Sequence, residues 1–294
     1  MLPSPRPHAT ANAQPRTRCP RWGRWLVAVL WGLLVAAGYS VYSGILTLPE
    51  RFNPWARLDV AATPNVLTPF KLSRAKSEPA PCLAALAQTG MRYSVLPDRV
   101  TGPGCGFENA VLLREAGVRL GPPVSLSCPM ALSFAMWERH ALQPAAQLHT
   151  GQRVTAITHL GSYACRNVNG GEPIAPPRSS TSCDSLPPQG AVLARGGPSR
   201  CTPALNAPPG NRSRHATADA LDIAGFTLAN GKTIAVLRQW QADDAVPVTG
   251  PDALFLKEAH RGACRYFKGV LGPDYNAAHS DHFHLETGGY NMCR

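Results

Sequence analysis

The chain has 294 residues, of which 44% are hydrophobic and only 16% are charged. This composition can bury a core and excludes wholesale disorder, whereas 29 prolines and 26 glycines exclude a coiled coil or a mainly helical bundle. The formal net charge is +11, but five arginines lie within residues 1–24 and no focused basic patch follows. We therefore expect no nucleic-acid partner, whereas a mildly basic domain suits anionic cell-wall polymer or lipid.

The N-terminal part predicts a membrane anchor. Residues 1–24 form a basic tail, and residues 25–48 contain no charged side chain. As a helix, residues 25–48 would span about 36 Å, which is enough to cross a bilayer. The upstream arginines place the N-terminus in the cytoplasm and the rest of the chain outside it. The alternative is a cleaved signal peptide, whose apolar region is usually shorter, about 7–15 residues.

The next elements are predicted from turn signals and apolar periodicity. Residues 49–80 carry several prolines with little periodicity and are interpreted as an extended linker. One compact domain is expected over residues 81–294, and it begins with a short helix that ends at Gly90. Short strands are expected over 93–95 and 111–113. Ser127 predicts the N-cap of a helix that runs to about residue 140, with Pro129 in its first turn.

A strand and a long loop are expected in the middle of the domain. Residues 154–160 alternate as a strand does. Residues 170–211 hold too many prolines and glycines for a regular element, so we expect a long surface excursion there.

The last third predicts a hairpin, a helix and a final strand. Asn230-Gly231 joins two apolar runs, 221–228 and 233–237, and this pattern is typical of a β-hairpin. An apolar stripe predicts a helix over 254–270. Residues 282–286 are expected to form the closing strand.

Cysteine usage indicates an oxidising compartment. Eight of the nine cysteines follow the apolar segment, and no Cys-x-x-Cys pair is present. This pattern favours four disulfides over a thiolate metal site, and it leaves the pairing open. Cys183 and Cys201 lie in one stretch rich in proline and glycine, so we expect them to close a local loop.

Two short segments, 213–222 and 279–284, carry side chains suited to metal chemistry. A catalytic zinc ion takes three nitrogen or oxygen ligands and keeps one position open for water. His215, Asp222 and His284 can supply two imidazoles and one carboxylate. The three can reach one point if His215 precedes the strand that holds Asp222 and His284 lies on a neighbouring strand.

A zinc ion on this ligand set keeps a positive charge, so it can polarise a carbonyl and acidify its bound water. Asp281 lies three residues before His284 and can take the proton from that water and pass it to a leaving amine. The alternative is that these side chains are solvated or cap turns and bind no metal.

The two segments resemble the signatures of the zinc D-Ala-D-Ala peptidases that trim peptidoglycan. Four residues match the Ser-x-His-x-x-Gly-x-Ala-x-Asp signature: Ser213, His215, Ala220 and Asp222. Ala218 replaces the glycine, which we expect to be tolerated only at negative φ. In the Glu-x-x-His signature, Asp281 stands in place of the glutamate, one methylene shorter, and His284 is the ligand.

Residues from about Cys82 to Arg294 resemble more closely the bacterial extensin-like C-terminal domain. The matching motifs are PERFNPW at 49–55, GSYACR at 161–166, ALDIAGF at 220–226, and LGPDYN at 271–276 leading into HSDHFH at 279–284. The resemblance implies an α+β fold like that of the zinc peptidases, with a small antiparallel sheet and helices packed on one side.

The resemblance to zinc peptidases also implies two further roles. An arginine in a Gly-Tyr-Arg-like segment steadies the substrate carbonyl in those enzymes, and Arg166 is the candidate here. The alternative is a surface arginine beside Cys165. The first histidine of a His-x-His pair helps to stabilise the reacting carbonyl oxygen in related metallopeptidases. His282 holds that place, and the alternative is packing behind His284.

We therefore expect a single-pass protein of the bacterial inner membrane, with a disulfide-bonded periplasmic domain. That domain is expected to bind one Zn²⁺ and to hydrolyse an amide bond in peptidoglycan peptides, with Asp281 as base. The alternatives are a module that holds cell-wall peptide without cutting it and a structural envelope protein without metal.

Overall fold

The computed structural model describes residues 21–168, 211–242, 247–289 and 291–294, which fall into two compact units divided after Asn53. The first unit contains the helix α1 (Arg21–Tyr42) and the short 3₁₀ helix η1 (Glu50–Phe52). Residues 22–42 have a mean hydropathy of 1.7, which fits a membrane span or a signal sequence. The helix ends before residue 48, and Gly44 just beyond it adopts a positive φ.

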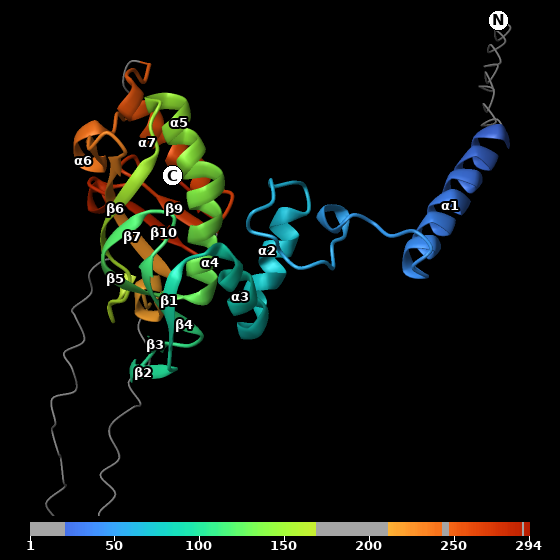
Figure 1. Ribbon diagram of the computed structural model, residues 1–294, viewed down its shortest axis with the longest axis horizontal. Helices are drawn as coiled ribbons and strands as arrows, with labels where there is room; N and C mark the ends of the chain where they lie inside the picture. The colour runs from blue at the N-terminus through green and yellow to red at the C-terminus, as the bar shows by residue number, and fades with distance from the viewer. Residues whose placement is uncertain (1–20, 169–210, 243–246, 290) are drawn as a thin grey trace, which may run out of the picture. The chain divides into compact units, whose positions relative to one another are not determined.

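The second unit is built on a mixed sheet of nine strands among the described residues (Figure 1). Eight strands follow one another across the sheet in this order: β1 (Arg92–Leu96), β4 (Ala110–Glu115), β5 (Arg119–Ser127), β6 (Val154–Gly161), β7 (Ala220–Leu228), β10 (Phe283–Glu286), β9 (Gly269–Leu271) and β11 (Met292–Cys293). The ninth strand, β8 (Thr233–Ala235), pairs with β7, and β2 (Arg99–Gly102) and β3 (Cys105–Phe107) form a separate hairpin.

The domain is α+β as expected, but the sheet is neither small nor wholly antiparallel. Strands β5 and β6 pair in parallel, and so do β9 and β11. A parallel pair needs a long crossover, which the helical segment between β5 and β6 supplies. The number of strands could not be read from the sequence because several of them have only two to four residues.

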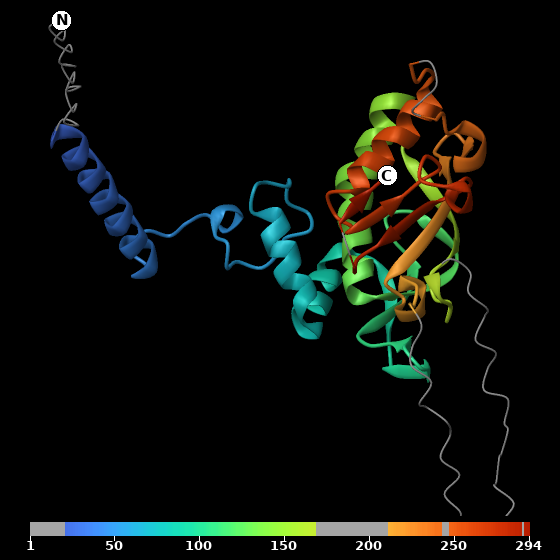
Figure 2. The same ribbon diagram turned by 180° about the vertical axis from the view of Figure 1, so that it is seen from behind.

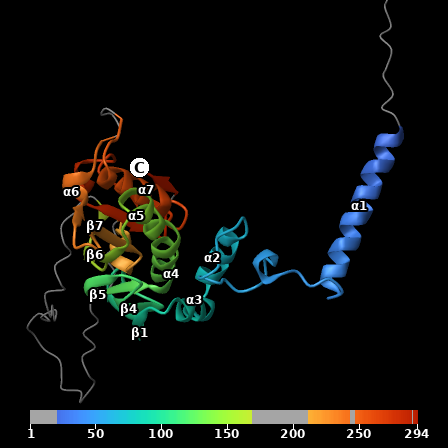
Figure 3. The ribbon, with the colours of Figure 1, turned by 45° about the horizontal axis from the view of Figure 1, so that its top comes forward.

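The helices α4, α5 and α7 lie together on one side of the sheet (Figures 1 and 3). The helices of this unit are α2 (Thr68–Ser77), α3 (Pro79–Leu86), α4 (Cys128–Trp137), α5 (Gln143–Thr150), α6 (Val236–Gln239) and α7 (Pro251–Ala263). Trp137 of α4 is fully buried, and its ring lies 6.4 Å from that of Phe226 on β7. Its indole N–H donates to the carbonyl of Ala259, so one side chain joins α4, α7 and the sheet.

Several local predictions are confirmed. Ser127 caps α4 by accepting a hydrogen bond from the backbone N–H of Met130, and Gly90 ends the first predicted helix with a positive φ. Asn230-Gly231 joins β7 to β8 as a hairpin. The helical segment, however, continues past residue 140 to Thr150 through a π turn, and Pro144 then falls in the first turn of α5, where no backbone donor is needed.

Two predicted boundaries are wrong. The helix expected over 254–270 ends at Ala263, and Val270 belongs to β9. Phe267 and Val270 are nevertheless buried in the core. The apolar spacing that suggested a longer helix therefore includes residues of the following turn and of β9. Residues 54–80 are not an extended linker, because α2 lies within them and Leu72 packs into the core. Pro69 and Pro79 lie in the first turns of α2 and α3, where proline favours the start of a helix.

Three disulfides join described cysteines. They are Cys82–Cys128, Cys105–Cys165 and Cys264–Cys293. The expected loop between Cys183 and Cys201 and the excursion over 170–211 lie outside the described residues.

Lys76 of α2 is a partly buried charge with a testable effect on stability. Its ammonium donates to the Ser133 hydroxyl and to the Tyr266 carbonyl. Burial, reinforced by the nearby charge of Lys268, lowers the pKa of Lys76 from 10.5 to about 8. The unfolded chain therefore binds more protons between pH 8 and 10.5, and the free energy of unfolding should rise with pH across that window.

We expect this rise to amount to about 2 kcal/mol after allowance for partial solvent screening. Lys76→Met should remove it. Urea unfolding of both proteins at pH 7.5 and pH 10 measures the difference, and parallel pH profiles would contradict the assignment.

Candidate metal centre

Two neighbouring strands bring Asp222 and His284 together. Strands β7 and β10 are antiparallel, and Asp222 lies directly opposite His284 in their register. Their chain neighbours Ile223 and Phe283 are fully buried in the core. Because successive side chains of a strand point to opposite faces, Asp222 and His284 project from the face away from α4, α5 and α7. Figure 2 shows the fold from behind, with the helices beside the sheet.

His215 reaches the same point from the turn before β7. It lies in the 3₁₀ helix η5 (Arg214–Thr217), where its backbone N–H donates to the Ser213 hydroxyl. Ala218 then turns the chain into the strand with φ 57°. The expectation of negative φ at this position is therefore wrong. Backbone hydrogen bonds from Ala218 to His215 and from Ser127 to Ala218 hold the left-handed conformation, which costs alanine about 1–2 kcal/mol.

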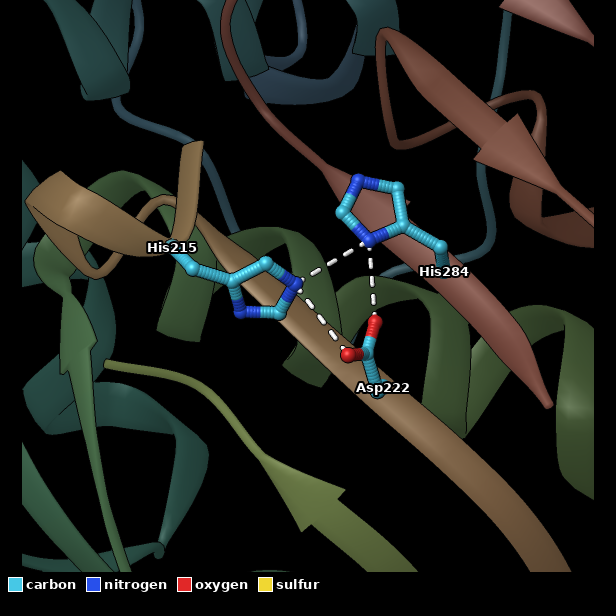
Figure 4. A group of neighbouring side chains, drawn as sticks. All are labelled: His215, Asp222 and His284. Carbon is cyan, nitrogen blue, oxygen red and sulfur yellow. Dashed lines mark hydrogen bonds and ion pairs between the residues drawn. The ribbon is translucent and has the colours of Figure 1, made fainter. Parts of the chain in front are cut away.

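The three predicted ligands converge (Figure 4). Nε2 of His215 lies 3.1 Å from Oδ2 of Asp222 and 3.2 Å from Nδ1 of His284, and this Nδ1 lies 2.9 Å from Oδ1 of Asp222. Ligand atoms about 2.0–2.1 Å from a tetrahedral zinc ion would lie about 3.3 Å apart, so the spacing and the donor types fit such an ion. These three residues form a group able to hold a metal ion.

The position of His215 is fixed by the segment after β6. Nδ1 of His215 donates to the carbonyl of Ser162, which leaves Nε2 free to face the centre. The backbone N–H of Ala164 donates to His215, and the disulfide Cys105–Cys165 ties this segment to β3. The sequence motif at residues 161–166 thus supports the first ligand through its backbone.

The electrostatics of the centre favour negative charge on Asp222 and positive charge on His284. Burial would raise the pKa of Asp222, but hydrogen bonds from His215 and His284 hold it well below its usual value. Burial would lower the pKa of His284, but Asp222 and Glu286 raise it to about 9. Nε2 of His284 lies 3.1 Å from the Glu286 carboxylate. A metal ion held by these residues would take the place of the proton on Nδ1 of His284.

Two of the other predicted site residues, Asp281 and His282, lie beside this centre. Oδ1 of Asp281 accepts from Nδ1 of His282, and Nε2 of His282 lies 3.6 Å from Oδ1 of Asp222. Burial and the charges of His284, His282 and Arg166 lower the pKa of His279 to about 4, against an opposing effect of Asp222. The charge of Arg166 thus reaches His279, which is neutral at ordinary pH.

Sequence reasoning missed two residues that touch the ligands, Ser162 and Glu286. Ser162 contributes a backbone carbonyl, which no side-chain pattern reveals. The position of Glu286 beside the centre could have been predicted from strand alternation, because Glu286 lies two residues after His284 and its side chain therefore lies on the same face of the strand.

Comparison with known proteins identifies the domain. A family model described as extensin-like protein C-terminus matches residues 80–182 and 192–294, together more than two thirds of the chain. No curated protein and no solved structure matches the chain. The matched residues include His215, Asp222 and His284, so the candidate centre is part of the family domain. The chain therefore belongs to the extensin-like C-terminal family.

Proposed function

We propose that the chain is a zinc-dependent hydrolase that cuts an amide bond in peptidoglycan peptides. One observation carries the proposal: two imidazole nitrogens and one carboxylate converge with mutual distances of 2.9–3.2 Å. Two His and one carboxylate are the ligand set of hydrolytic zinc sites that keep an open position.

His215, Asp222 and His284 would hold the ion through Nε2, a carboxylate oxygen and Nδ1. A zinc ion bound there supplies a polarised carbonyl and an acidic water. The His282 ring lies between the Asp281 carboxylate and Asp222, which supports a role for His282 as proton carrier and for Asp281 as the residue that orients its ring. Arg166 supplies positive charge for an amide oxygen as it gains negative charge.

The proposed location follows from α1 and the disulfides. We propose that α1 is a retained anchor in the bacterial inner membrane and that the domain lies in the periplasm. Three described disulfides support an oxidising compartment.

The function is tested on soluble peptidoglycan fragments. The full chain is purified in detergent without a metal-affinity tag, supplied with one equivalent of zinc, and incubated with muramidase-released peptides. We expect mass spectrometry to find products that have gained one water at a single amide bond, and none with His215→Ala or a chelator. Fragments that bind the protein but stay intact would favour the cell-wall-binding module, and neither binding nor cleavage would favour a structural role.

A further inference from the structure

Glu286 is a buried carboxylate that lies against the candidate metal centre. It is only 8% exposed, and its Oε2 lies 3.1 Å from Nε2 of His284. Both residues lie on β10, two positions apart, so both side chains stand on the face that carries the centre. His284 is thus bound on both sides, by Asp222 at Nδ1 and by Glu286 at Nε2.

The neighbouring strand is shaped to admit this carboxylate. Gly269 of β9 lies directly opposite Glu286 in the register. A Cβ atom at Gly269 would stand 2.8 Å from both Cδ and Oε1 of Glu286, closer than real side chains approach. Gly269 is not among the residues with positive φ, so its backbone conformation does not call for glycine. Glycine is required at position 269 because its lack of a side chain leaves room for the Glu286 carboxylate.

A buried carboxylate is costly unless it is paired and hydrogen-bonded. The described partner of Glu286 is a ring nitrogen of a predicted metal ligand. A carboxylate that accepts the proton of one ring nitrogen fixes the orientation of the ring and directs the other nitrogen to the metal.

We propose that Glu286 is a positioning residue, which holds the Nε2 proton of His284 and so presents Nδ1 to the metal. The inference rests on the proposed zinc site. It adds a residue outside the three ligands, and it gives Gly269 the function of making room for that residue.

Metal affinity is the first test. The full chain in detergent competes for Zn²⁺ with a chromophoric chelator, as wild type and as variants. We expect Glu286→Ala to weaken binding about 10–100-fold, the usual effect of removing such a partner. Glu286→Gln should weaken it less, because an amide oxygen still accepts the ring proton. Gly269→Ala should also weaken it, since the new methyl group displaces the Glu286 carboxylate from its place.

Glu138→Gln is the matched control. Glu138 is an equally buried carboxylate, 7% exposed, that accepts a hydrogen bond from Gln143 and is not part of the centre. We expect unchanged zinc affinity in this variant. Affinities of Glu286→Ala and Gly269→Ala within twofold of the wild type would overturn the proposal.

A second readout needs no metal. In protein with ¹⁵N-labelled histidine, the Nε2 proton of His284 should exchange slowly in the wild type and in His215→Ala, and should be lost in Glu286→Ala. A wild type that binds no zinc would refute the proposed zinc site. The exchange rate of the Nε2 proton would still establish whether Glu286 holds the His284 ring. An equally protected ring proton in Glu286→Ala would overturn the positioning role even if zinc binds.

Discussion

His215→Ala is expected to abolish stoichiometric zinc binding in a chain that stays folded. The wild type should carry about one zinc ion, and the variant should lose at least 10³-fold in affinity, beyond the 10–100-fold typical of a residue that only supports a ligand. The reason is geometric, since two protein ligands remain where a catalytic zinc site takes three and leaves the fourth position to water. The lost hydrogen bond to the Ser162 carbonyl should cost about 1–3 kcal/mol of stability.

Metal content and thermal unfolding check this prediction together. Free zinc at 100 times its Kd should stabilise the wild type by about 2.7 kcal/mol, and it should leave the midpoint of His215→Ala unchanged. His159→Ala is the control, because its ring bonds to the Pro122 carbonyl and is not part of the centre. A folded, disulfide-intact wild type without stoichiometric zinc would refute the zinc proposal and favour a binding or structural role.

The candidate centre of His215, Asp222 and His284 was accessible from the sequence because its members lie in two short segments with strong local signals. Asp222 follows a turn and enters an apolar strand, and His284 alternates with Phe283 and Leu285. Local signals could suggest that His284 lies on a neighbouring strand but could not show that β10 pairs with β7, because β10 begins 55 residues after β7 ends. The register that sets Asp222 opposite His284 is a property of the whole sheet.

Other features escaped prediction because tertiary contacts overrode a local preference. Ala218 adopts a left-handed conformation that alanine disfavours, because backbone hydrogen bonds on both sides of it fix the turn. Residues 68–77 form a helix although the prolines within residues 49–80 indicated a linker, because Leu72 and Ala75 share a face that packs into the core. In each case the local sequence allows more than one backbone conformation, and burial or hydrogen bonds to other parts of the fold determine which conformation is adopted.

The pair formed by Asp281 and His282 gives the second large expected effect, which lies on turnover. Asp281 is half exposed, whereas the His282 side chain is 12% exposed and lies between Asp281 and Asp222. In the proposed reaction, a proton that leaves water at the centre would therefore meet the His282 ring before it meets Asp281. His282→Ala should therefore lower kcat about 10²–10⁴-fold, the usual contribution of a positioned acid–base group.

Asp281→Asn should lower kcat by less, because the asparagine oxygen can still accept the Nδ1 proton and orient the ring, while the charge that stabilises a protonated His282 is lost. Both variants should keep their zinc, since neither residue belongs to the ligand set, and this separates a proton-carrying role from a metal-binding one. The measurement is kcat on the cleaved peptide beside zinc content per chain. If kcat of Asp281→Asn were lower than kcat of His282→Ala, Asp281 would be the base that acts on the water directly. Loss of zinc in His282→Ala would instead make His282 a fourth ligand and exclude it as the proton carrier.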